Sequence, residues 1–232
     1  YHLTNLKKDA RLVTTHMSTI KTIIFDLDNT LFDTEAQCVD KALEEAIKTM
    51  IDEGMQADTK DAFMTIKAFY KKHPSKDNFA LLAKHYNANT LVGRKGKETY
   101  YTADIKDISL FEGAKELLFM LSKDYQLALL TFGNPSRQQK KIEILGIKDI
   151  FDKILITEEE DKETAFLQLI DDLGIRQNRI LVIGDRIDTE LAIGNKLGMK
   201  TVRVLHGRYS ILQPKNKLQE PDYTIKRIKD LQ

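Results

Sequence analysis

Short apolar runs recur along the chain, and each of them ends at an Asp, Thr or His residue or at a Gly-Asp pair. The runs have the length of a strand, and their apolar residues do not alternate with polar ones in the way a half-buried strand requires. This pattern is typical of strands that are covered on both faces, as in a parallel sheet. The runs are Ile23–Phe25, Leu127–Leu130, Ile154–Ile156, Ile180–Ile183 and Thr201–Leu205.

Segments with helical spacing of apolar residues lie between these runs, over residues 114–121, 166–173 and 191–197. Strands that alternate with helices indicate parallel strands joined by right-handed crossovers. We therefore predict an α/β fold with a Rossmann-like, doubly wound parallel sheet. Ligands of such sheets bind at the carboxyl ends of the strands, where this chain places its Asp, Thr and Gly residues.

The stretch from residue 35 to 108 has no convincing strand run and carries apolar residues at helical spacing, so we predict an α-helical insertion there. We expect the core to comprise residues 20–34 and 109–232, with an edge strand near Tyr223–Ile225 and a final helical turn. The polar residues 1–19 are expected to form an N-terminal extension outside the fold. The basic and aromatic residues from Arg94 to Tyr101 are interpreted as a solvated helix end rather than a binding site.

Composition excludes several classes of protein. The net charge of +1 with no long basic block argues against a nucleic-acid partner. The single cysteine, Cys38, cannot form an internal disulfide or a cysteine-ligated zinc site, and the five histidines show no ligand spacing. The apolar runs are too short to span a bilayer, and no secretory signal is evident. We expect a cytoplasmic protein without a membrane partner, whose oligomeric state the sequence leaves open.

Asp26 and Asp28 form the sharpest candidate site. They follow the first apolar run directly, so both carboxylates are expected at the same rim of the sheet. Two carboxylates placed there without a cation would repel each other and lose hydration. Mg²⁺ resolves this conflict, because it binds one or two carboxylates together with water and phosphate oxygens. A surface turn with an Asx cap is the alternative for this motif.

The segment Ile23–Leu31 resembles the first motif of the haloacid dehalogenase (HAD) superfamily of phosphohydrolases, and the resemblance continues in order over nearly all of residues 20–232. Thr131 matches the family's second motif, Lys162 the third, and Gly184-Asp185 the fourth. The helical insertion resembles the family's C1 cap, here residues 35–108. Two departures from the family's pattern stand out. Glu163 replaces the Pro often found after the Lys, and Glu190 holds a position that is usually Asp, so either Asp188 or Glu190 is a candidate support for the metal.

The resemblance and the chemistry of phosphate esters lead to the same roles. Asp26 is expected to attack phosphorus and form an aspartyl-phosphate, while Asp28 protonates the leaving oxygen and later deprotonates water. The metal ligands are expected to be Asp26, Asp28 and Asp185, with the backbone carbonyl of Asp28 implied by the resemblance. Thr131, Lys162 and the backbone around Phe132 and Gly133 are expected to bind the phosphate.

The resulting hypothesis is a Mg²⁺-dependent phosphatase for a small phosphorylated metabolite. A phosphomutase of the same fold remains an alternative, and so does a phospho-Asp switch module that binds phosphate without turnover. A degenerate, non-catalytic family member is a further alternative, although all the core residue types are present. A true dehalogenase has no need of the second acid, Asp28. The sequence does not identify the substrate.

Overall fold

The computed structural model describes residues 19–73, 76–158 and 162–231. They form two compact units, one made of the described residues of Tyr1–Glu35 and Asp107–Gln232, and the other of those of Ala36–Lys106. Apart from Thr19, the predicted N-terminal extension lies outside the described residues. None of the helices in the described part of the chain has both the length and the apolar character needed to cross a membrane.

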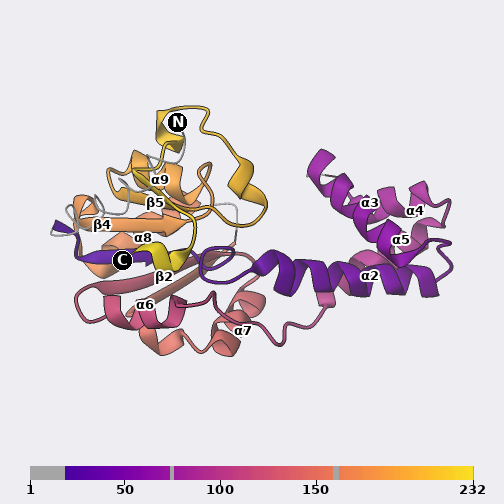
Figure 1. Ribbon diagram of the computed structural model, residues 1–232, viewed down its shortest axis with the longest axis horizontal. Helices are drawn as coiled ribbons and strands as arrows, with labels where there is room; N and C mark the ends of the chain where they lie inside the picture. The colour runs from indigo at the N-terminus through magenta and orange to yellow at the C-terminus, as the bar shows by residue number, and fades with distance from the viewer. Residues whose placement is uncertain (1–18, 74–75, 159–161, 232) are drawn as a thin grey trace. The chain divides into compact units, whose positions relative to one another are not determined.

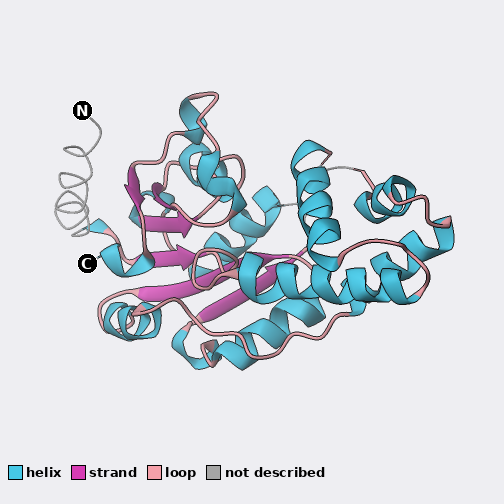
Figure 2. Ribbon diagram, turned by 45° about the vertical axis from the view of Figure 1, so that its right-hand side comes forward, coloured by secondary structure: helices cyan, strands magenta, loops and turns pink. Residues whose placement is uncertain are grey.

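A six-stranded parallel sheet forms the centre of the first unit, with the strand order β3-β2-β1-β4-β5-β6 (Figures 1 and 2). The strands are β1 (Thr22–Phe25), β2 (Gln126–Phe132), β3 (Lys153–Thr157), β4 (Ile180–Gly184), β5 (Lys200–Val204) and β6 (Tyr223–Ile225). The predicted doubly wound parallel sheet is confirmed, including the short edge strand near the C-terminus. The order reverses direction at β1, so the carboxyl end of this strand lies at the switch point where such sheets bind ligands.

The position of β1 follows from its burial. All four of its residues are buried, and it pairs with β2 on one side and β4 on the other. Phe25 lies opposite Leu129 and Ile183, which fixes the register on both sides. The residues after Phe25 therefore leave the sheet between the ends of β2 and β4.

Helices cover both faces of the sheet. Residues of α8 (Lys162–Leu173) and α9 (Glu190–Lys196) share one hydrophobic cluster with Ile24, Leu130 and Val182. The helices α6 (Ala114–Leu121) and α7 (Pro135–Leu145) lie on the opposite face (Figure 1). Short 3-10 turns complete the unit: η3 (Lys148–Ile150), η5 (Gln177–Arg179), η6 (Arg208–Ile211), η7 (Lys217–Gln219) and η8 (Ile228–Leu231).

The second unit is helical, as the insertion was predicted to be. A π-helical turn, η2 (Glu35–Val39), is followed by α2 (Asp40–Asp52), α3 (Thr59–Lys72), α4 (Asn78–His85) and α5 (Thr90–Thr102). These helices enclose a hydrophobic cluster of their own, which includes Ile47, Met50, Ile66 and Phe79. The sequence did not predict α5 as a separate element, because Gly93 and Gly96 weaken its helical signal.

The two glycines of α5 allow neighbouring helices to come close. A β-carbon on Gly96 would lie 2.5 Å from Sδ of Met50 on α2, and one on Gly93 would lie 3.0 Å from the carbonyl oxygen of Phe79 on α4. Lys95 and Lys97 form ion pairs with Glu53 and Asp77 within the same unit. These lysines therefore lie within the span of α5, where their charges are paired.

Candidate active site

Asp26 and Asp28 lie where β1 leaves the sheet. The backbone N–H of Asp26 donates to the carbonyl of Ile183 at 2.9 Å, so the chain stays attached to β4 up to this residue. The Thr30 hydroxyl donates to Oδ2 of Asp26 at 3.1 Å. Asn29 takes up a left-handed conformation with φ 59°, a conformation that Asn tolerates better than most residues. This local turn directs the chain back on itself directly after the two acids.

β4, the neighbour of β1, ends at Gly184 and is followed by Asp185. Asp185 is only 3% exposed, and so is Glu190, the first residue of α9. Oε1 of Glu190 accepts a hydrogen bond of 2.6 Å from the backbone N–H of Arg186, and Oε2 accepts one of 2.5 Å from the Thr189 hydroxyl. The side chain of Glu190 therefore folds back toward the end of β4.

The acids influence one another strongly. Desolvation and the nearby charges of Glu190, Asp185 and Asp28 hold the pKa of the Asp26 carboxyl well above its usual value. Burial, followed by the charge of Glu190, raises the pKa of Asp185 to about 8. Burial also raises the pKa of Glu190, although its hydrogen bonds oppose the shift. The structure thus concentrates mutually repelling acidic groups at the carboxyl ends of β1 and β4.

Asp188 and Glu190 occupy different environments. The Asp188 side chain is 40% exposed and forms an ion pair with the Arg186 guanidinium, in which Nε and Oδ1 are 3.3 Å apart. Glu190 is buried and interacts electrostatically with both Asp26 and Asp185. Of the two candidate supports for a metal, Glu190 is the one that belongs to the acidic cluster.

The candidate phosphate-binding residues lie on the other side of β1. Thr131 is fully buried on β2, and its hydroxyl oxygen accepts a hydrogen bond from Gln138, which leaves the hydroxyl hydrogen to donate. Lys162 begins α8, and its ammonium nitrogen lies 4.6 Å from the centroid of the Phe132 ring. The N–H of Gly133 donates to the carbonyl of Thr157 at 2.9 Å, so a phosphate oxygen would have to compete for it.

Sequence reasoning missed two residues of this region, Gln138 and Lys141, both on α7. Nζ of Lys141 lies 2.7 Å from Oδ1 of Asp28, and Nε2 of Gln138 lies 2.8 Å from Oδ2 of the same carboxylate. Asn134 caps the helix by accepting from the N–H of Arg137, and Pro135 follows at its first position. This start signal could have revealed α7, on which residues 138, 141, 142 and 145 share one face.

The acidic cluster fits a hard cation. Oδ2 of Asp185 is buried without a hydrogen-bond partner in the described part of the chain. Such an atom calls for an explanation, and a bound ion is one of the usual ones. Among the described residues, no three His, Cys, Asp or Glu side chains are placed to hold a metal by themselves. Mg²⁺ has no need of such a set, since it usually keeps several waters and binds one or two carboxylates.

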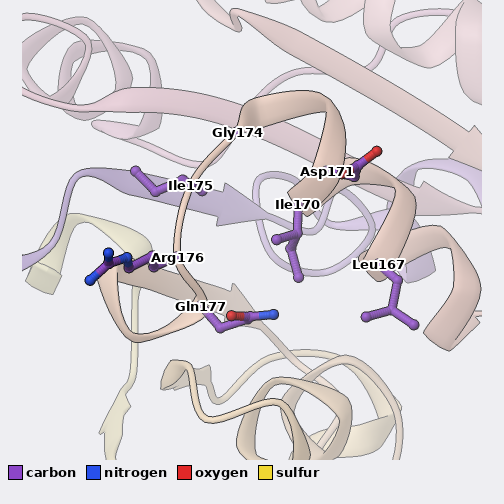
Figure 3. A pocket seen from close by; sticks show the side chains of 7 residues that line it. All are labelled: Leu167, Ile170, Asp171, Gly174, Ile175, Arg176 and Gln177. Carbon is purple, nitrogen blue, oxygen red and sulfur yellow. The ribbon is translucent and has the colours of Figure 1, made fainter.

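A pocket of about 350 Å³ lies elsewhere in the sheet-containing unit (Figure 3). Leu167, Ile170 and Asp171 of α8 line it together with residues 174–177, which lead into the amino end of β4. Asp26 and Asp185 follow the carboxyl ends of their strands, at the opposite edge of the parallel sheet. The pocket is therefore separate from the acidic cluster.

The parallel sheet places acids at the ends of β1 and β4 and a buried Thr on β2, which is the arrangement expected of a HAD-type hydrolase. The family model for haloacid dehalogenase-like hydrolases matches residues 20–198, and the chain belongs to this family. The resemblance found in the sequence is thereby confirmed.

Individual relatives extend the comparison over most of the chain. The chain is 26% identical to a glyceraldehyde 3-phosphate phosphatase of Methanopyrus kandleri, over 91% of this chain and 95% of that protein. It is 25% identical to the N-acylneuraminate-9-phosphatase of Rattus norvegicus, over 79% and 82% respectively. In fold it is similar to the HAD-type protein YfnB of Bacillus subtilis, solved bound to magnesium, with a TM-score of 0.67, 20% identity and coverage of 91% and 96%.

Proposed function

We propose that the protein is a Mg²⁺-dependent phosphatase that hydrolyses a small phosphate monoester through an aspartyl-phosphate on Asp26. The observation that carries this proposal is the acidic cluster of Asp26, Asp185 and Glu190. Burial raises the pKa of all three carboxyl groups, and repulsion from neighbouring acids raises those of Asp26 and Asp185 further. Titratable groups perturbed by burial and by a neighbouring charge cluster at functional sites. The names of the relatives, two kinds of phosphatase, support the same reaction.

Asp26 and Asp185 are the proposed carboxylate ligands of the metal, and the buried Glu190 interacts electrostatically with both of them. The side chain of Asp28 is engaged by Lys141, Thr34 and Gln138, so its backbone carbonyl is the part that remains for the metal. The ion, when bound, screens the carboxylates from one another and from the phosphate and so favours the ionised form of Asp26. An ionised Asp26 is needed because only the carboxylate is a nucleophile.

The remaining steps belong to the side chains of this chain. A carboxylate oxygen of Asp26 attacks phosphorus, and the bond to the leaving oxygen breaks. Asp28 gives that oxygen a proton, and it later removes one from the water that releases phosphate from Asp26. The Thr131 hydroxyl and the Lys162 ammonium group are proposed to hold the phosphoryl oxygens during both steps.

The helical unit is proposed to act as the cap domain. The sequence predicts residues 35–108 for this domain, and the structure has the helical unit at Ala36–Lys106. In this role it would exclude water and contact the part of the substrate that leaves. The proposed substrate class is a small phosphorylated metabolite, as the names of both relatives indicate.

The test is a screen of phosphorylated metabolites for released inorganic phosphate, with MgCl₂ and with EDTA. We expect turnover that depends on Mg²⁺ and falls by about 10³-fold or more in Asp26→Asn. Wild-type activity in Asp26→Asn would contradict the proposal. Accumulation of a phosphorylated isomer instead of phosphate would identify a mutase, and a persistent phospho-aspartate without turnover would identify a switch module.

A further inference from the structure

The carboxylate of Asp28 is held by three side chains. Oδ1 accepts hydrogen bonds from Nζ of Lys141 at 2.7 Å and from the Thr34 hydroxyl at 2.6 Å. Oδ2 accepts one from Nε2 of Gln138 at 2.8 Å. Contacts at both oxygens fix the plane of the carboxyl group as well as its position.

Lys141 is unusual for its burial. The residue is only 7% exposed although it carries an ammonium group, which lies 5.8 Å from the centroid of the buried Phe32 ring. Lysine is almost never buried to this extent unless it is paired, and desolvation of the two charges offsets much of their attraction. The pair is therefore a weak source of stability, whereas it strongly restricts where Asp28 can lie.

Gln138 extends this network to the phosphate-binding side of the site. Besides Oδ2 of Asp28, its Nε2 contacts the Thr131 hydroxyl at 2.5 Å and the Phe132 carbonyl at 3.3 Å. The same amide group thus contacts the proposed acid and the proposed phosphate ligand. Gln138 is 2% exposed, so bulk water hardly competes for these contacts.

We propose that Lys141 is a positioning residue for the proton transfers of Asp28, with Gln138 as its partner on the same face of α7. A carboxyl oxygen has two lone pairs, and those of Oδ1 are both used by Lys141 and Thr34. Among the described residues, Oδ2 accepts a hydrogen bond from Gln138 alone, and it is therefore assigned as the oxygen that carries the proton. This inference rests on the proposed phosphatase function.

Asp28 gives up one proton and regains one in each turnover. In the first step the O–H bond at Oδ2 of Asp28 breaks, and its proton goes to the leaving oxygen as the bond from that oxygen to phosphorus breaks. In the second step Oδ2 takes a proton from water as the water oxygen attacks the phosphoryl group on Asp26. Lys141 keeps its own protons throughout and acts only through Asp28.

The experiment compares kcat/KM of wild type and Lys141→Met on aryl phosphates whose leaving groups differ in basicity, in the presence of MgCl₂. A basic leaving group, as in phenyl phosphate, needs a proton from Asp28, whereas 2,4-dinitrophenolate leaves without one. We expect a loss of about 10²-fold on phenyl phosphate and of less than about tenfold on 2,4-dinitrophenyl phosphate. An equal loss on both substrates overturns the proposal, because a purely structural defect lowers both rates alike.

A double-mutant cycle gives a second readout. In the Asp28→Asn background, Lys141→Met should cost less than about threefold on phenyl phosphate, because its action runs through the missing carboxylate. A full loss in that background overturns the proposal and indicates that Lys141 acts on the phosphoryl group itself. Lys140→Met, which changes the exposed neighbouring lysine of the same helix, is the matched control and should behave as wild type.

A loss of activity must be distinguished from a failure of the variant to fold. Circular dichroism and the unfolding midpoint are measured for each variant, and Gln138→Met replaces Lys141→Met in the series if the latter does not fold. The same leaving-group selectivity is expected from it, since it acts at the other oxygen of Asp28. Failure of the proposed function is distinguishable, because the wild-type protein itself would then release no phosphate from any of these esters.

Discussion

Gly184 has no side chain at the point where Glu190 folds back against it: a β-carbon on Gly184 would lie 2.6 Å from Oε1 of Glu190. The glycine that ends β4 therefore determines where the buried carboxylate lies. Its importance comes from this close approach and not from its backbone conformation, since it is absent from the positive-φ residues.

We predict that Gly184→Ala displaces Glu190 and destabilises the protein by about 1–3 kcal/mol, as overpacking of a buried site usually does. Urea unfolding measures this loss. In a Glu190→Ala background the same substitution should cost much less, because the atoms that clash are gone. Equal costs in both backgrounds would show that the glycine has another role.

Metal-free protein should lose stability as the pH rises. The folded state holds the proton of Asp185 up to about pH 8, whereas the unfolded state loses it near the usual value of 3.8. Below pH 3.8 the carboxyl is protonated in both states, and between these values the folded state binds more protons. Stability therefore falls across this window, by at most about 1.4 kcal/mol per pH unit for this carboxyl. Urea unfolding in EDTA at a series of pH values measures the slope.

Added Mg²⁺ should stabilise the protein more at pH 8 than at pH 5, because binding requires ionised carboxylates. Asp185→Asn removes the titrating group and one proposed ligand, so its unfolding should depend less on pH and respond less to Mg²⁺. An undiminished response to Mg²⁺ in this variant would show that the ion binds elsewhere.

Lys162→Met should weaken the binding of inorganic phosphate, measured as competitive inhibition, by about tenfold or more, since hydrogen bonds to charged groups contribute about 1.5–3 kcal/mol. The ammonium group next to Phe132 supplies this charge in the proposed site. Lys148→Met, at an exposed position in η3, serves as the control for the change in net charge. Inhibition that is unchanged in Lys162→Met would remove Lys162 from the phosphate site.

In the helical unit, Gly96→Ala should destabilise the protein even though Ala favours a helix by about 1 kcal/mol over Gly. The new β-carbon would lie 2.5 Å from Cγ and Sδ of the fully buried Met50. We expect a net loss of about 1–2 kcal/mol, smaller when Met50 is replaced by Ala. Glu98→Ala, at an exposed position of the same helix, is the control in thermal unfolding.

The sheet could be predicted from the sequence because its strands are apolar on both faces and end at polar residues. The first, second and fourth strand ends brought Asp26, Thr131 and Asp185 to one edge, since the carboxyl ends of parallel strands meet there. The same reasoning did not predict helices α5 and α7, for different physical reasons. The glycines of α5 pack against other helices, and the buried face of α7 is partly polar.

The roles of α7 residues could not be read from apolar periodicity, because Gln138 and Lys141 occupy positions where a core helix normally carries apolar side chains. Their burial is balanced by contacts with Asp28, a residue more than a hundred positions away in the sequence. The sequence alone could not distinguish Asp188 from Glu190, because Asp188 lies just before α9 and Glu190 begins it. They differ in burial, since Glu190 is buried whereas the Asp188 side chain is exposed.

The separate hydrophobic cluster of the helical unit has a consequence for how this chain can diversify. Because α2–α5 enclose their own apolar residues, substitutions among them are absorbed locally and leave the residues that hold the sheet together untouched. Variation in residues 36–106 can therefore accumulate under selection for new partners or ligands while the acids at the ends of β1 and β4 keep their places. With the helical unit in its proposed role as a cap, such a chain can change what it recognises faster than it changes its chemistry.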